Sequence, residues 1–244
     1  MSSSPSRLVG VRVVLCDADG NLFPSEEPAF AASTEVTNHF LAENGVDRRY
    51  GSEELRLAAT GMNYRSVLQT LAREHALPEI TPEALEHWVQ LEREAVTAHL
   101  REALHADPDV LGPLAALAEH HGLAAVSSSA DARIAACFEV TGMARYFPPE
   151  RRFSAEDSLA VPTSKPDPAI YLHALRALAL EPEHAVAVED SPTGATSAVA
   201  AGIPTIGNLQ FVQPAEQDER RRLLTEAGVV TVVSSWDEVV DLVG

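Results

Sequence analysis

The stretch VRVVLCDADGNLFPSEEP, residues 11–28, joins a short apolar run to two closely spaced aspartates. The run 11–16 is apolar except for one arginine, which is the length and character of a single buried strand. Asp17 and Asp19 follow it directly. Residues i and i+2 lie on the same side of a strand, so the two carboxylates are pushed together where the strand ends. Like charges that close destabilise each other unless something compensates them.

The composition limits the classes of function. The chain has 244 residues, 45% of them apolar and 22% charged, which is typical of a soluble globular protein with one large domain or two smaller ones. Its net charge is −18, from 36 acids against 18 lysines and arginines. Such a charge argues against unspecific binding to nucleic acid or to an anionic membrane. An anionic substrate would need a local cation.

Cysteine content and hydropathy predict a cytoplasmic protein. Cys16 and Cys137 are far apart and form no CxxC pair, which favours a reducing compartment. We interpret Cys16 as a small buried thiol, because it points away from the side of Asp17 along the strand. No run reaches the length that spans a membrane, and the apolar segment 8–16 contains an arginine and is followed by no signal-peptide cleavage site.

The period of the apolar residues changes after residue 28. Helices are predicted at 29–44, at 63–77, where the spacing is i, i+3, i+4, i+7, and from Pro82 to about His105. Thr81 before Pro82 is a typical helix start. No convincing strand lies between residues 29 and 105, so this part is predicted to be an all-helical insert.

From residue 108 onward, predicted strands and helices alternate. The strands are 123–129, 185–190, 203–207 and 229–235, and the helices are 112–121, 131–140, 168–179, 192–201 and 218–227. Alternation of this kind is typical of a parallel sheet covered by helices on both faces. The predicted fold is α/β, with a doubly wound (Rossmann-like) parallel sheet core from residues 1–22 and 108–244. The helical insert is residues 23–107.

Polar residues gather where the predicted strands end. Ser127, Ser128 and Ser129 end one strand, Glu189 and Asp190 end another, and Lys165 lies between them in the segment SKPDP. In an open parallel sheet, ligands bind outside the carboxyl ends of the strands. Each signal alone has an ordinary interpretation: a turn, a helix cap or a surface lysine. Their common location favours a functional site.

The same motifs resemble those of the haloacid dehalogenase-like superfamily of phosphohydrolases, in the phosphatase and phosphoglucomutase-like branch with a helical cap. DADGN, residues 17–21, resembles the nucleophile motif of that superfamily, and Ser127 its strand-end serine or threonine. SKPDPAIYLHAL, residues 164–175, resembles its lysine motif, and AVAVEDSPTGATSAVAAGIPTIG, residues 185–207, its acidic motif. One position departs from the pattern: Asn21 stands where threonine or valine is usual.

The resemblance implies an Mg²⁺-dependent phosphatase that hydrolyses a small phosphate ester, such as a sugar phosphate, through an aspartyl-phosphate. Asp17 would attack phosphorus. Asp19 would act as general acid and then as general base. Ser127 would donate a hydrogen bond to a phosphate oxygen, and Lys165 would neutralise the developing charge.

The resemblance also implies a metal site and a substrate site. The metal ligands would be Asp17, Asp19 (through its backbone carbonyl), Glu189 and Asp190. Substrate contacts would come from Gly20, Asn21, Ser128 and Arg65. Arg65 belongs to the segment 60–65, which sits where related caps place a substrate loop, and the cap, residues 23–107, would close over the site.

Two alternatives remain open at this stage. A sugar-phosphate mutase of the β-phosphoglucomutase type would use the same aspartates and differ in what accepts the phosphoryl group. A non-catalytic binding protein on the same scaffold would have lost a motif acid, and none is lost. A haloacid dehalogenase is disfavoured, since those relatives lack an acid equivalent to Asp19. The expected partner is a small phosphate ester, not nucleic acid or a membrane, and the expected state is a monomer or homodimer.

Overall fold

The computed structural model describes residues 7–58 and 62–244, and it divides the chain into two compact units. The sheet unit comprises Met1–Pro24 with Leu104–Gly244, and the helical unit comprises Ser25–Ala103. Each unit has its own apolar core. That the helical unit serves as a cap stays a prediction.

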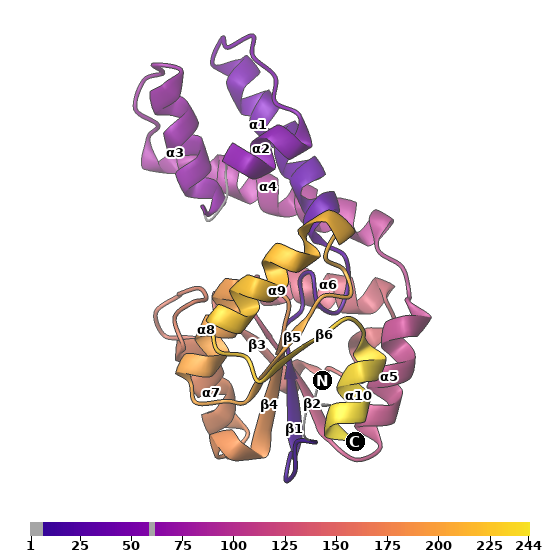
Figure 1. The fold of residues 1–244 in the computed structure, drawn as a ribbon. Helices are drawn as coiled ribbons and strands as arrows, with labels where there is room; N and C mark the ends of the chain where they lie inside the picture. Colours follow the sequence, from indigo (N-terminus) through magenta and orange to yellow (C-terminus); the bar gives the residue numbers. More distant parts are fainter. Residues whose placement is uncertain (1–6, 59–61) are drawn as a thin grey trace. The chain divides into compact units, whose positions relative to one another are not determined.

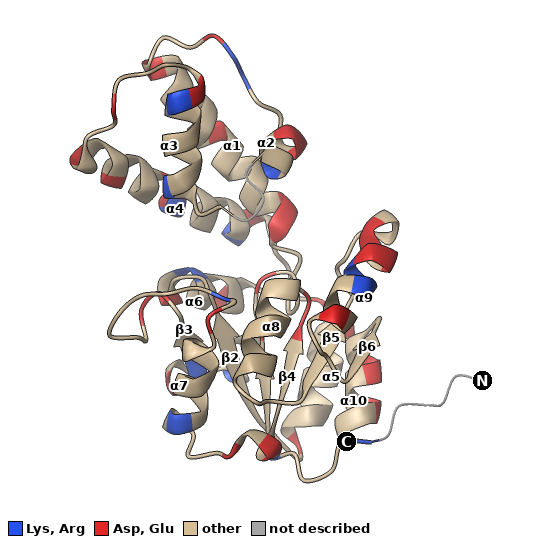
Figure 2. Cartoon of the chain, turned by 60° about the vertical axis from the view of Figure 1, so that its left-hand side comes forward, with Lys and Arg blue, Asp and Glu red and all other residues tan. Residues whose placement is uncertain are grey.

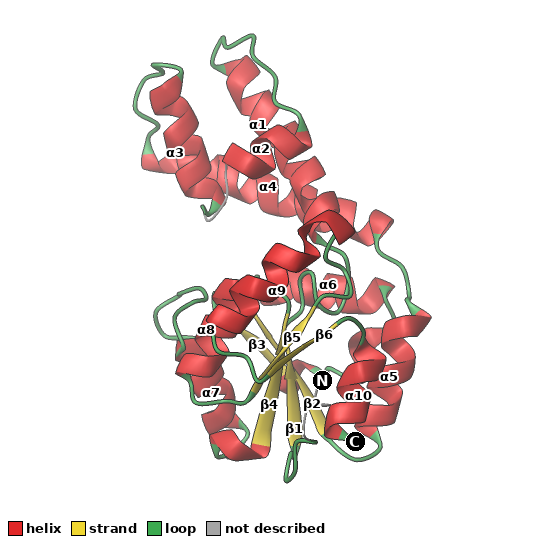
Figure 3. Cartoon of the chain, viewed as in Figure 1, coloured by secondary structure: helices red, strands yellow, loops and turns green. Residues whose placement is uncertain are grey.

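Six parallel strands form one sheet in the order β3-β2-β1-β4-β5-β6 (Figure 3). The strands are β1 Val13–Cys16, β2 Gly122–Ser127, β3 Arg152–Ser154, β4 Ala185–Glu189, β5 Thr205–Asn208 and β6 Thr231–Val233. All four residues of β1 are buried, as its apolar run predicts. The carboxyl end of β1 therefore lies between those of β2 and β4.

Helices cover both faces of this sheet (Figure 1). On one face α5 and α10 contact each other, and on the other α7 contacts α8. The helices of the sheet unit are α5 Pro108–Ala118, α6 Asp131–Val140, α7 Ala169–Ala177, α8 Pro192–Ala200, α9 Gln217–Glu226 and α10 Trp236–Val243, with short 3-10 helices η1 Met143–Arg145, η2 Pro149–Arg151, η3 Pro182–His184 and η4 Pro214–Glu216. The predicted α/β doubly wound fold is confirmed.

Alternation along β1 directs Asp17 toward the α7 face. Val13 and Leu15 lie in an apolar cluster with Ile170 and Tyr171 of α7. Asp17 is two residues beyond Leu15 and shares its side of the strand. The first aspartate of the motif is therefore placed at the edge of a closely packed core, where few water molecules can reach it.

The helical unit consists of α1 Glu26–Glu43, α2 Ser52–Ala58, α3 Tyr64–Glu74 and α4 Pro82–Ala103. Phe40, Leu68 and Trp88 contribute to its core. The predicted start of the last helix is confirmed, because the Thr81 hydroxyl accepts a hydrogen bond from the backbone N–H of Ala84 at 3.2 Å. Thr60 and Gly61, which belong to the predicted substrate loop, lie outside the described residues.

Three parts of the sheet unit differ from the sequence prediction. The helix α5 begins at Pro108, before the predicted start at 112: the Asp107 carboxylate accepts a hydrogen bond from the N–H of Asp109 at 2.9 Å, and a proline is tolerated in the first turn. β3 has only three residues, too few for periodicity to reveal. α10 was missed because its valines continue the strand-like pattern of β6, although Ser235 caps it.

Membrane insertion of a helix finds no support in the described residues. Across 7–58 and 62–244, no helix is both long and apolar enough to cross a bilayer.

Candidate active site

Three carboxylates converge where β1 and β4 end. Asp17 follows β1, Glu189 closes β4 and Asp190 comes next, and an oxygen from each lies within 4.8 Å of the other two. The parallel register causes this convergence, because Cys16 pairs with Val188 and the next residues along each strand become neighbours. All three side chains are buried, Glu189 completely.

Lys165 places its ammonium group between two of these carboxylates. Its Nζ donates to Asp17 Oδ1 at 2.5 Å, to Glu189 Oε1 at 2.6 Å and to the carbonyl of Val126 at 2.8 Å. Lys165 is the single lysine of the sequence, and the other 17 of its 18 lysines and arginines are arginines. A compact ammonium with three donors fits this enclosed point, where a planar guanidinium would not.

Burial and neighbouring charges set the ionisation of this pair. Burial raises the pKa of the Asp17 carboxyl to about 8, with Lys165 opposing the rise and Glu189 adding to it. Burial alone would lower the pKa of Lys165, but Asp17 and Glu189 hold it above its ordinary value. Lys165 therefore stays positively charged. Its single charge is not enough to keep the buried Asp17 ionised, so an ionised Asp17 requires a further cation.

The buried oxygens fit a hard divalent cation. Glu189 Oε1 accepts from Lys165 and, at 2.5 Å, from the hydroxyl of Tyr171. Its Oε2 is buried and has no hydrogen-bond partner among the described residues, which is costly for a carboxylate. The Glu189 carboxylate and the oxygens of Asp17 and Asp190 form the all-oxygen donor set that Mg²⁺ prefers.

Two glycines allow the backbone to close around these carboxylates. A Cβ at Gly194 would overlap the carboxylate of Glu189, and one at Gly20 would lie 2.6 Å from Asp190 Oδ2. Gly20 also has a φ of +79°, a left-handed conformation that glycine adopts without strain. Its predicted role in bringing the backbone close to a ligand stays a prediction.

Asp19 lies apart from the three converging carboxylates and is held by residues of the β2–α6 region. Its Oδ2 accepts from the hydroxyl of Ser129 at 2.7 Å and from that of Ser127 at 3.5 Å. Its Oδ1 accepts from Arg133 Nη2 at 3.0 Å. The sequence prediction did not include Arg133. The signal that could have revealed it is a basic side chain early in the helix that follows the serines.

Asn21 connects three strand ends. Its side-chain amide is fully buried, donates to the carbonyls of Asp17 and Val188 at 3.0 Å each, and accepts from Asn208 at 3.0 Å. Both polar atoms of the amide are thus bonded within the protein. Asn21 therefore ties the residue Asp17 to β4 and β5, and its predicted contact with substrate stays a prediction.

The other predicted substrate residues lie in different surroundings. Ser127 is buried, and its Oγ accepts from the N–H of Ser129 at 3.0 Å. The hydroxyl of Ser128 accepts from the backbone N–H of Lys165 at 3.3 Å and so supports the lysine loop. Arg65 is on α3 of the helical unit, where it pairs with Glu86 at 2.5 Å. Its contact with substrate stays a prediction.

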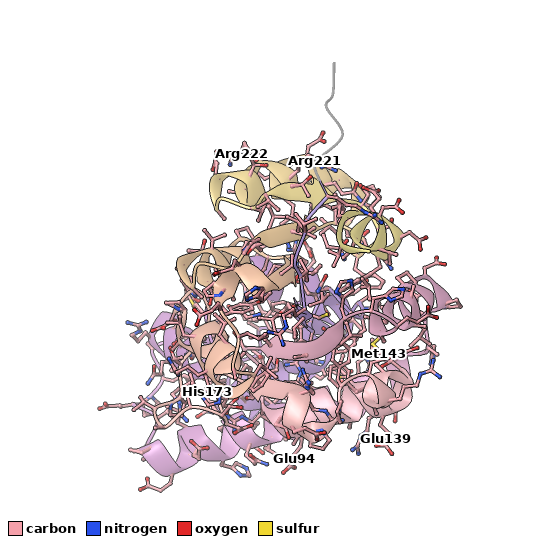
Figure 4. The ribbon with its side chains drawn as sticks, turned by 90° about the horizontal axis from the view of Figure 1, so that it is seen from below. Glu94, Glu139, Met143, His173, Arg221 and Arg222 are labelled. Atoms are coloured by element: carbon pink, nitrogen blue, oxygen red, sulfur yellow. The ribbon has the colours of Figure 1, made fainter. Side chains whose placement is uncertain are left out.

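Three consecutive arginines on α9 have three different surroundings. Arg220 Nη1 donates to the Asp190 carbonyl at 2.8 Å and lies 3.4 Å from its Oδ2. Arg221 donates to the carbonyl of Val232, and Arg222 pairs with two glutamates of its own helix. Figure 4 shows Arg221 and Arg222 at the outer side of α9. Sequence alone did not distinguish Arg220, because only the rotation of the helix does so.

The acidic residues outside the site are dispersed. Figure 2 shows Asp and Glu on helices of both units. The net charge of −18 therefore acts as a general repulsion of anions. A negatively charged substrate depends on local cations at the strand ends.

Replacing Lys165 should destabilise the protein strongly. Lys165→Met leaves Asp17 and Glu189 buried without their shared cation, and removing one partner of a buried ion pair costs about 3–5 kcal/mol of unfolding free energy. The measurement is urea denaturation in metal-free buffer. Arg222→Met, which removes two exposed ion pairs, is the matched control and should leave the midpoint unchanged. Equal midpoints for both variants would contradict the assigned role of Lys165.

The comparisons with known proteins agree on one family. Residues 11–202 match the sequence model of the haloacid dehalogenase-like hydrolases. Protein CbbY of Cereibacter sphaeroides is 32% identical over 212 residues, 82% of this chain and 85% of that protein. The 6-phosphogluconate phosphatase of Escherichia coli K12 is 26% identical over 193 residues, 79% of this chain and 80% of that protein. The crystal structure of a HAD family hydrolase from Deinococcus radiodurans R1, with bound phosphate and sodium, is 27% identical with a TM-score of 0.68, covering 94% of this chain and 93% of that one.

Proposed function

The chain belongs to the haloacid dehalogenase-like hydrolase family, and from this premise we propose that it is an Mg²⁺-dependent phosphatase acting through an aspartyl-phosphate on Asp17. The class of enzyme, a phosphoric monoester hydrolase, is that of its relatives. The observation that carries the proposal is the convergence of Asp17, Glu189 and Asp190 around a single buried lysine at the carboxyl edge of the sheet.

In the proposed first step, a carboxylate oxygen of Asp17 attacks phosphorus and the bond to the ester oxygen breaks. Asp19 gives its proton to the departing oxygen, which leaves as an alcohol. In the second step Asp19 takes a proton from water as that water attacks phosphorus, and the Asp17 carboxylate is released with inorganic phosphate. Lys165 stabilises the negative charge that develops on the phosphoryl oxygens, and Ser127 donates to one of them.

Asp17, Glu189 and Asp190 would hold the metal ion, with the carbonyl of Asp19 as a further ligand. When bound, Mg²⁺ offsets the charge of the clustered carboxylates and of the phosphate group. Support comes from the buried Glu189 Oε2, which has no hydrogen-bond partner in the described part of the chain. Arg220 holds Asp190 from the side of α9 and so positions it for this role.

Sugar phosphates are the proposed substrates. The relatives include a phosphatase named for 6-phosphogluconate, a small phosphate ester. In this proposal the helical unit selects among such esters, with Arg65 as one contact, while Ser128 and Gly20 shape the phosphate side. A cytoplasmic location and the state of assembly, monomer or homodimer, stay predictions.

Phosphate release should require a divalent metal. We expect turnover of p-nitrophenyl phosphate and of a panel of sugar phosphates with Mg²⁺, and its loss in excess EDTA. Asp190→Asn should weaken Mg²⁺ binding, measured by calorimetry, far more than it lowers the unfolding midpoint, because Asp190 is one of the three converging carboxylates. Full turnover in EDTA, with no metal retained by elemental analysis, would contradict the proposal.

A further inference from the structure

Both oxygens of the Asp19 carboxylate are engaged by the β2–α6 region. Arg133 pairs with Oδ1 at 3.0 Å, and the hydroxyl of Ser129 donates to Oδ2 at 2.7 Å. The two partners of the ion pair are partly exposed, with side-chain exposures of 27% for Arg133 and 26% for Asp19. Solvent, and a ligand of the right charge, can therefore reach the pair.

These contacts occupy both oxygens of the Asp19 carboxylate. The role proposed for Asp19 requires one of these oxygens to reach the leaving group and later the attacking water. The contact with Arg133 therefore has to open during turnover, and an anionic group on the substrate offers Arg133 a replacement partner.

Arg133 is also the accessible cation of this edge among the described residues. Lys165, with 5% of its side chain exposed, is engaged by Asp17 and Glu189, and Arg220, with 18% exposed, is engaged by Asp190. An anionic substrate approaching a chain of net charge −18 needs such a cation. A guanidinium matches carboxylate and phosphate groups alike, through two parallel hydrogen bonds.

We propose that Arg133 is a specificity-determining residue that exchanges Asp19 for a second anionic group of the substrate, a carboxylate or a second phosphate. The inference rests on the proposed phosphatase function and names its substrate class: small phosphate esters that carry a further negative charge. Binding of that charge by Arg133 opens the ion pair and leaves an oxygen of Asp19 available to the leaving group. No covalent bond changes in the exchange.

Matched substrates test the exchange. 6-Phosphogluconate and glucitol 6-phosphate are open-chain esters that differ by a carboxylate. Fructose 1,6-bisphosphate and fructose 6-phosphate differ by a phosphate. With Mg²⁺, the wild-type protein should have a kcat/KM at least ~10-fold higher for the doubly anionic member of one pair, the size expected for a charged hydrogen-bonded contact. The pair that shows the preference identifies the second group as a carboxylate or a phosphate.

Arg133→Gln should bring that ratio to about one, because neither member of a pair then gains from a guanidinium. The ratio of the two kcat/KM values is the readout, not the rate on either substrate alone. Arg133→Lys should restore part of the preference. Arg222→Gln, on the exposed side of α9, is the control and should change neither value.

The outcomes separate this inference from the function on which it rests. Equal losses for both members of a pair in Arg133→Gln, or an unchanged ratio, overturn the exchange while the phosphatase function stands. The exchange is also overturned, and the phosphatase function stands, if p-nitrophenyl phosphate is hydrolysed and none of the four sugar esters is. No hydrolysis of any ester with Mg²⁺ overturns the proposed function itself.

Discussion

Asp17→Asn should abolish turnover, lowering kcat on the order of 10⁴-fold or more, as loss of a nucleophile does in other enzymes. The amide has nearly the shape of the carboxylate but cannot attack phosphorus. The measurement is a rapid-quench time course with p-nitrophenyl phosphate, in which the variant should show neither burst nor steady-state release. A burst that persists in Asp17→Asn would remove Asp17 from the role of nucleophile.

Asp17→Asn should leave the fold intact. The pH dependence of its unfolding free energy provides the control. Burial raises the pKa of Asp17 from 3.8 to about 8 in the metal-free protein, so the folded state favours the protonated form. The stability that this proton contributes is present below about pH 4 and is lost as pH rises to about 8. Asp17→Asn has no carboxyl at this position, so its stability is not lost in this way as pH rises. Relative to wild type, its unfolding free energy in EDTA should therefore increase between pH 5 and pH 8.

Asp19→Asn should have an effect that depends on the leaving group. An alkyl phosphate needs its departing oxygen protonated, so its first step should slow by roughly 100- to 10,000-fold, the range for general acid–base catalysis. p-Nitrophenolate leaves without a proton, so that step should suffer far less. Breakdown of the aspartyl-phosphate still lacks its base, and the intermediate should accumulate.

Rapid-quench experiments with both esters distinguish these steps for Asp19→Asn. We expect a burst of p-nitrophenolate followed by slow release of phosphate, and no burst with the alkyl ester. Equal losses for the two substrates, without accumulation of the intermediate, would exclude Asp19 as the general acid and base. Ser129→Ala is a matched control, since it removes one hydrogen bond to Asp19 while keeping the carboxylate.

The convergence of Asp17, Lys165, Glu189 and Asp190 was predictable because it needs only local pattern and one topological rule. Each acid follows an apolar strand, and parallel strands present their carboxyl ends at one edge. For Lys165 the chain offers a second signal, since the sequence contains no other lysine. These features depend on strand direction and not on the exact packing of helices.

Arg133, Arg220 and the orientation of Asn21 were not predictable in this way. Whether an arginine reaches a strand end depends on the rotation of its helix, and α9 offers three in succession. The amide of Asn21 faces the sheet because Asn208 supplies its partner from β5, far along the chain. Contacts of that kind follow from tertiary packing, which periodicity does not report.

The central position of β1 has a consequence for the assembly of the chain. Val13 pairs with Gly122 on one side and with Ala185 on the other, so the first strand obtains both neighbours only from distant sequence. During synthesis, β1 and the complete helical unit emerge from the ribosome long before β4. Pairing across such separations is entropically costly and slows folding. The helical unit, whose contacts are local, can form early, while the apolar β1 remains exposed until its partners are translated.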